Sequence, residues 1–126
     1  MNEILSQSEG GVLTLTFNRV ERKNSINVAM YDALATALER AVDDAATRVL
    51  LIQGHETVFS AGNDIEDFLR NPPAGQHTPV FRFLRGSASF PKPLLAAVCG
   101  PAVGVGTTLL FHCDLVYAGD NAAFSM

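Results

Sequence analysis

The sequence predicts an α/β domain, and two observations carry this prediction. Short apolar runs that are typical of buried strands alternate with segments whose apolar residues recur at helical spacing. Glycine-rich loops follow two of these runs, at the strand ends where open α/β sheets place their ligands. The chain has 126 residues, of which 48% are hydrophobic, so it is long enough for one domain with a sizeable core.

The first predicted elements are a hairpin and a long helix. Residues 4–8 and 12–17 flank two glycines that suit a tight turn, and the second arm alternates apolar and hydroxyl residues, which places Leu13, Leu15 and Phe17 on the core face. Residues 28–46 show apolar spacing of three and four, which predicts an amphipathic helix with Asn27 as its cap. The apolar positions of this helix are Met30, Leu34, Leu38, Ala41 and Ala45. We expect its charged face to be solvated.

The later elements alternate in the same way. Residues 48–54 form a continuous apolar run, which predicts a strand covered on both faces. Asp64 caps the next helix, residues 71–75 form a mobile loop, and a second helix spans residues 79–89, with Val80, Phe83, Leu84 and Ala88 on one face. A strand from Leu94 then passes through a Gly-Pro turn into a helix that ends near Cys113. Residues 115–118 and 122–125 are the last two strands.

The loop Phe59-Ser60-Ala61-Gly62-Asn63-Asp64-Ile65 is the first candidate site. Its small side chains allow a ligand to touch the main chain. A loop that leads into a helix also presents free N–H groups, which bind an anion or stabilise a carbonyl oxygen that becomes negative during a reaction. Taken alone, the loop is equally consistent with an ordinary turn between a strand and a helix.

Three motifs together resemble the crotonase superfamily of enoyl-CoA hydratases and isomerases. They are the loop just described, the glycine-rich stretch of residues 94–109, and the basic segment Asn18-Arg19 with residues 22–27, in which Ser25 replaces the family's alanine. Residues 61–64, 100–104 and 124–126 are most similar to peroxisomal-type Δ3,Δ2-enoyl-CoA isomerases.

The resemblance implies a crotonase-like spiral of ββα units. Residues 1–126 would form the N-terminal part of a single acyl-CoA-binding domain, truncated before the family's C-terminal helices. We therefore expect either a fragment or a truncated homologue. The intact family member is expected to be a homotrimer or a dimer of trimers.

The resemblance also assigns the site residues. The backbone N–H groups of Asn63 and Val105 would form the oxyanion hole for a thioester carbonyl. Contacts with coenzyme A and substrate would come from Lys23, Asn24, Ser25, Ala61, Gly62, Asn63, Asp64, Ile65 and Gly104. No cofactor is expected, because the coenzyme A thioester is itself the substrate.

Position 108 separates two candidate reactions. Family hydratases use two carboxylates to handle water, one of them at this position, and Thr108 cannot act as an acid or base near neutral pH. An isomerase needs one carboxylate to move a proton between C2 and C4, and in the family this base lies beyond residue 126. We expect an isomerase of fatty-acid β-oxidation. The alternatives are a hydratase and a non-catalytic acyl-CoA-binding homologue.

Composition weighs against several other classes. The net charge of −4 and the pI of about 5.2 oppose binding to DNA or RNA, although Arg19, Arg22 and Lys23 form a local basic cluster. Leu109 stands where a dinucleotide fingerprint needs its third glycine, and the chain has no P-loop motif.

The remaining residue types predict a protein without metal or membrane. Cys99 and Cys113 lack metal or redox spacing and are expected to be buried free thiols, and the three histidines show no metal-ligand pattern. No signal sequence or membrane span is apparent. We therefore expect a cytoplasmic protein, or a peroxisomal one in a eukaryote.

Overall fold

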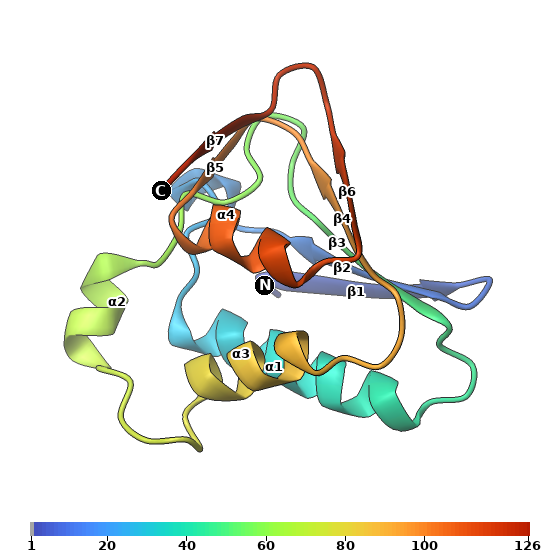
Figure 1. Cartoon of the computed structure of the whole chain (residues 1–126). Coiled ribbons are helices and arrows are strands. Elements are labelled where there is room, and N and C mark those ends of the chain that lie inside the picture. The colour runs from blue at the N-terminus through green and yellow to red at the C-terminus, as the bar shows by residue number, and fades with distance from the viewer. Residues whose placement is uncertain (1) are drawn as a thin grey trace.

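The computed structural model describes residues 2–126 and confirms the α/β class (Figure 1). Its main sheet has five strands in the order β1-β2-β3-β4-β6. β1 and β2 form the predicted antiparallel hairpin, and the other neighbours are parallel. The strands are β1 (Ile4–Glu9), β2 (Val12–Phe17), β3 (Val49–Gln53), β4 (Leu94–Val98) and β6 (Leu115–Ala118).

A second, smaller layer gives the fold its spiral. β5 (Pro101–Val103) pairs in parallel with β7 (Ala123–Ser125). Single parallel bridges, Ser60 to Ala102 and Ile26 to Asn63, continue this layer toward the N-terminus. Successive turns of the chain therefore give a strand to the main sheet and then an extended stretch to the small layer. Helical segments connect these turns, as the expected ββα units require.

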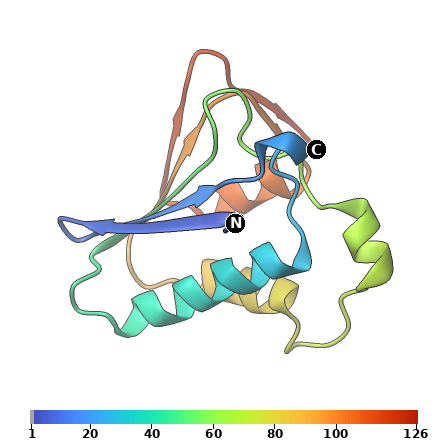
Figure 2. The ribbon, with the colours of Figure 1, turned by 180° about the vertical axis from the view of Figure 1, so that it is seen from behind.

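The helices gather on one face of the main sheet. α1 (Val28–Asp43) and α3 (Pro79–Ala88) lie side by side there, while α2 (Ile65–Arg70) projects from the side (Figures 1 and 2). α4 (Val105–Thr108) continues into the 3₁₀ turn η2 (Leu109–His112), and η1 (Val20–Arg22) follows β2. The prediction that residues 48–54 are covered on both faces is wrong, because only the alternate residues Leu50 and Ile52 are fully buried.

α1 begins as predicted and ends earlier. The Asn27 side chain accepts a hydrogen bond of 2.8 Å from the Met30 N–H and caps the helix. At the other end, Lys92 Nζ donates to the carbonyl oxygens of Ala41, Asp44 and Thr47 at 2.6–2.8 Å. These main-chain acceptors lie at the helix terminus and in the turn after it, so the ammonium stabilises the end of the helix.

Two expectations about helix surfaces are wrong. Ala45 is exposed because it lies beyond the end of α1, and Ala88 is exposed while Ser87 is the buried residue of that turn. The charged face of α1 is exposed, as expected. Arg82 of α3 pairs with Asp32 and Glu39 at 2.8 and 2.7 Å, because the two helices pack side by side.

The prediction of a Gly-Pro turn after β4 is only partly correct. Residues 101–103 form β5, because their main chain pairs with β7 and, through Ala102, with Ser60. The hairpin's core face is correct for Leu15 and Phe17, which are buried, whereas Leu13 is only partly buried against the core. Within residues 2–126, no helix is long and apolar enough to cross a membrane.

Two glycines provide a matched test of this packing. A Cβ at Gly106 would lie 2.6 Å from the Ser60 carbonyl oxygen, whereas a Cβ at Gly86 of α3 would meet Leu38 at an ordinary 3.5 Å. Gly106→Ala is expected to destabilise the fold by about 1–3 kcal/mol through overpacking. Gly86→Ala is expected to stabilise it by about 0.5–1 kcal/mol through helix propensity. Urea unfolding of both variants measures the difference, and equal effects would contradict the close approach.

Candidate functional site

The two predicted loops lie against each other. Ser60 and Ala102 form a parallel bridge, and the Val103 N–H donates to the Ser60 carbonyl at 3.0 Å. Gly62 has a φ of +93°, and a Cβ there would lie 2.8 Å from the Val103 oxygen. Only glycine fits this conformation and this space. The structure thus brings residues 60–63 to residues 102–106, as the sequence predicts.

The hydrogen bonds around Asn63 fix the direction of its N–H. The Gly62 carbonyl accepts from the Ile26 N–H at 2.8 Å, and the Asp64 N–H donates to the Ile26 carbonyl at 2.9 Å. In a trans peptide the N–H points opposite to the C=O, so the Asn63 N–H points away from Ile26. Among residues 2–126, it has no hydrogen-bond acceptor.

The Val105 N–H is free for a similar reason. The Gly104 carbonyl accepts from the N–H groups of Thr107 and Thr108, both at 2.9 Å, and is therefore directed into α4. The N–H of the same peptide unit, which belongs to Val105, points out of the helix start. It too lacks an acceptor in the described part of the chain. Two unpaired main-chain donors thus lie on adjoining loops.

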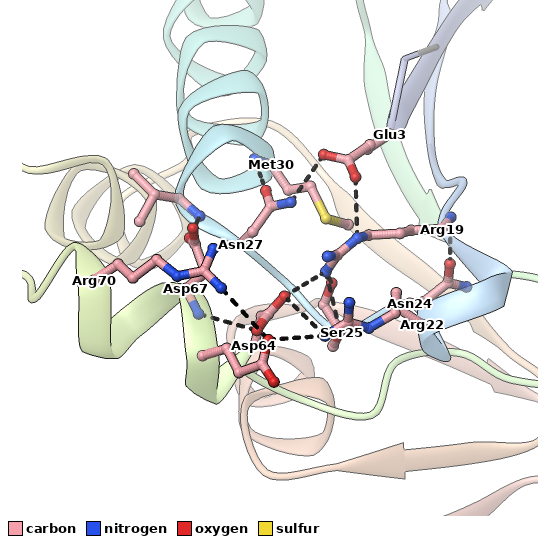
Figure 3. Close-up of polar contacts among 12 residues, drawn as sticks. Glu3, Arg19, Arg22, Asn24, Ser25, Asn27, Met30, Asp64, Asp67 and Arg70 are labelled. Atoms are coloured by element: carbon pink, nitrogen blue, oxygen red, sulfur yellow. Dashed lines mark hydrogen bonds and ion pairs between the residues drawn. The ribbon is translucent and has the colours of Figure 1, made fainter.

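A buried ion pair supports the first loop (Figure 3). Arg19 binds Asp64 at 2.9 Å and Glu3 at 3.0 Å, and it also donates to the Ser25 carbonyl at 2.9 Å. Asp64 caps α2 as predicted, through a bond of 3.1 Å from the Asp67 N–H. That N–H, followed by the Arg19 guanidinium, holds the pKa of Asp64 below its usual range despite burial. Asp64 is therefore an ionised structural carboxylate.

The basic segment, residues 18–27, holds the fold together in addition to presenting charged side chains. Asn24 is fully buried, and its side chain accepts from the Arg19 N–H and donates to the Val58 and Phe59 carbonyls. Its side chain is therefore fully occupied within the protein, and the predicted contact of Asn24 with coenzyme A would have to come from its main chain. The Ser25 hydroxyl accepts a bond of 3.1 Å from Arg19, while Lys23 remains exposed.

The main chain of this segment runs beside the candidate loop. The Ala61 N–H donates to the Lys23 carbonyl at 2.9 Å. Both residues line a cavity of about 500 Å³ whose other lining residues are mainly apolar. Asn63, Gly104 and Val105 lie outside the lining of this cavity, and Ile65 is exposed on α2. The structure thus places Lys23 and Ala61 in one hollow and the two free amides beside it in the fold.

Tyr31 contacts the candidate site, and the sequence motifs do not predict this contact. Its hydroxyl donates to the Asn63 side-chain oxygen at 2.5 Å, although its ring is buried in α1. Burial raises the pKa of Tyr31 well above its ordinary value, so the phenol is a stable donor. The sequence does place Tyr31 next to Met30 on the core face of the predicted helix. Because a buried phenol needs a polar partner, this position indicates that Tyr31 forms a hydrogen bond.

The described residues offer little for metal chemistry. No group of three or more metal-ligating side chains comes together within residues 2–126. Both cysteines are free and only half-buried, whereas full burial was expected. Burial, with the nearby charge of Asp114, raises the pKa of the Cys113 thiol to about 11.

Comparison with known proteins decides the family. The model of the enoyl-CoA hydratase/isomerase family matches residues 7–126. The chain belongs to this family. Enoyl-CoA delta isomerase 2 of Homo sapiens is 40% identical over 124 residues, covering 93% of this chain and 31% of that protein. The 1,2-epoxyphenylacetyl-CoA isomerase of Escherichia coli is 42% identical over 135 residues, covering all of this chain and 51% of that protein.

A solved structure agrees with the family assignment. OdaA of Pseudomonas aeruginosa superimposes with a TM-score of 0.94 and 50% identity, covering 98% of this chain and 50% of that one. The crotonase resemblance and the fold class predicted from the sequence are confirmed. This enoyl-CoA hydratase/isomerase family member spans about half the length of the relatives it matches, or less.

The Arg19–Asp64 pair predicts a pH-dependent stability. Because the folded pKa of Asp64 is lowered, its contribution is present above the unfolded value near 4 and is lost as pH falls through the folded value. Asp64→Asn, which keeps a capping side chain but removes the charge, is expected to cost about 2 kcal/mol at pH 7. Urea unfolding should give a smaller cost at pH 3.

The exposed Asp43, at the end of α1, provides the control. Asp43→Asn should change the free energy of unfolding by about 0.5 kcal/mol or less at both pH values. A penalty for Asp64→Asn that is the same at pH 7 and pH 3 would refute the assignment of Asp64 as an ionised partner of Arg19.

Proposed function

We propose that this chain supplies the acyl-CoA-binding and oxyanion-stabilising part of an enoyl-CoA isomerase. One observation carries the proposal: Asn63 and Val105 present unpaired main-chain N–H groups on loops that touch each other. Both residues occupy the positions to which the family motif assigns the oxyanion hole. The Val105 side chain does not remove this donor, because the main chain supplies it.

The proposed chemistry is a proton shift. A base removes a proton from C2 of a 3-enoyl thioester, and the electron pair moves through the conjugated system onto the carbonyl oxygen. Two N–H donors aimed at this oxygen contribute several kcal/mol by comparison with other oxyanion sites, roughly 3–4 kcal/mol for each donor. The same base returns the proton to C4, which leaves the double bond at the 2-position. The proposed base lies outside residues 1–126.

Two features favour isomerisation over hydration. Thr108 stands where family hydratases carry a glutamate, and a hydroxyl cannot deprotonate water near neutral pH. Asp64, the carboxylate nearest in sequence to Asn63, is occupied by Arg19 and the start of α2. A second carboxylate for water is therefore not provided by these groups, whereas one base outside the chain is sufficient for the proton shift.

The cavity beside Lys23 and Ala61 is the proposed location for part of coenzyme A. Its volume of about 500 Å³ and its apolar lining suit the ligand's uncharged portion, while the exposed Lys23 ammonium suits its phosphates. The contacts of Ser25, Gly62, Ile65 and Gly104 with the ligand remain part of the proposal. The trimeric assembly and the cytoplasmic or peroxisomal location remain predictions.

The reaction is tested by comparing two substrates. The full-length gene product that carries this chain should convert a 3-enoyl-CoA into the 2-enoyl-CoA and should hydrate 2-enoyl-CoA much more slowly. Absorbance of the conjugated thioester follows both reactions. Hydration as fast as isomerisation would favour the hydratase alternative. Binding without either reaction would favour the non-catalytic homologue.

Two substitutions at one position test the main-chain donor. Asn63→Pro removes the N–H and is expected to lower kcat/KM by about 10²–10³-fold. Asn63→Ala keeps the N–H and is expected to stay within about tenfold of the wild type, because only the loop's side-chain contact is lost. Circular dichroism and thermal unfolding check that both variants fold. Equal losses of kcat/KM in the two variants would mean that the Asn63 side chain, rather than its N–H, is required for activity.

A further inference from the structure

Tyr31 reaches from the core to the residue whose amide is proposed to stabilise the oxyanion. Its hydroxyl is 2.5 Å from the Asn63 side-chain oxygen, and no other side chain in residues 2–126 forms a hydrogen bond with Asn63. We propose that Tyr31 is a positioning residue, which limits the movement of the already oriented Asn63 N–H by holding the Asn63 side chain. This inference rests on the proposed function of Asn63.

The phenol is a fixed anchor. Tyr31 is 1% exposed, and its ring packs edge-on against Phe83 of α3, with a centroid distance of 5.6 Å. The ring of Phe68 in α2 also packs against it, tilted and with a centroid distance of 6.0 Å. Because three helices confine the ring, the hydroxyl has little freedom to follow a moving loop.

Asn63 is in the opposite situation. It is exposed, and it follows Gly62, which has no side chain through which the loop could be anchored to the core. Ile26 holds the two flanking peptide groups, through the Gly62 carbonyl and the Asp64 N–H. The side-chain bond to Tyr31 adds a third, independent point of attachment. With three points fixed, the free N–H has one orientation.

The consequence for catalysis is geometric. Oxyanion donors act through preorganisation, because they must already point at the oxygen when charge develops. The two hydrogen bonds to Ile26 orient the peptide unit of Asn63, but they leave it free to rock as long as its side chain is not held. The hydrogen bond from the core removes this motion and leaves the N–H itself unused.

The test measures the polarisation of a bound thioester carbonyl. The probe is a saturated acyl-CoA with a ¹³C-labelled thioester carbonyl, whose infrared band shifts to lower frequency when N–H groups donate to the oxygen. Tyr31→Phe keeps the ring and removes the hydroxyl. It should lose a measurable part of the wild-type shift, but less than the half that removal of one donor would cost, because the Asn63 N–H remains and is only less well aligned. The affinity for the probe should change little.

Two further variants make the result specific. Asn63→Ala removes the same hydrogen bond from the loop side without altering the core, so it should lose as much of the shift as Tyr31→Phe. The double variant should lose no more than either single variant, because both substitutions remove one interaction. Tyr117→Phe is the matched control, since Tyr117 is 60% exposed on β6, and it should leave the shift unchanged.

The outcomes separate this inference from the proposed function. A wild-type chain that binds the probe without any shift overturns the oxyanion site and this inference together. A wild-type shift that persists in Tyr31→Phe or in Asn63→Ala overturns the positioning role alone. If Tyr31→Phe fails to fold, Asn63→Ala decides: loss of shift supports the inference, and an unchanged shift refutes it.

Discussion

The buried guanidinium of Arg19 is the interaction on which the candidate site depends. It joins Glu3, which directly precedes the first strand, to the turn at Ser25 and to the helix cap Asp64. A buried charge of this kind is stable only while its partners are in place, and removing one partner typically costs about 3–5 kcal/mol. The residue that fixes the loops is therefore a buried side chain and not one of the proposed ligand-binding residues.

This arrangement divides the work between side chains and main chain. Side chains such as Arg19, Asn24 and Tyr31 face inward and hold the loops, while peptide groups of the same loops face outward with unused donors. A main-chain donor cannot be lost by most substitutions, since every residue except proline keeps its N–H. The scaffold therefore keeps its chemical group while the sequence of the loop changes.

The sequence correctly predicts those features that one residue and its sequence neighbours determine. The caps Asn27 and Asp64 and the turn between the first two strands are of this kind, because each depends on bonds to residues a few positions away. The errors lie where a distant segment decides. Residues 101–103 become a strand only because β7 and Ser60 pair with them.

The open edge of the main sheet has a consequence for handling the protein. Within residues 2–126, β6 pairs only with β4, and its residues Leu115, Val116 and Tyr117 are exposed. The opposite edge, β1, instead presents Ser6, Gln7, Ser8 and Glu9. An exposed apolar strand with unpaired peptide groups is a template on which another chain adds by backbone hydrogen bonding. Self-association of this chain at high concentration would thus begin at β6, and a lysine on that strand is the substitution suited to suppress it.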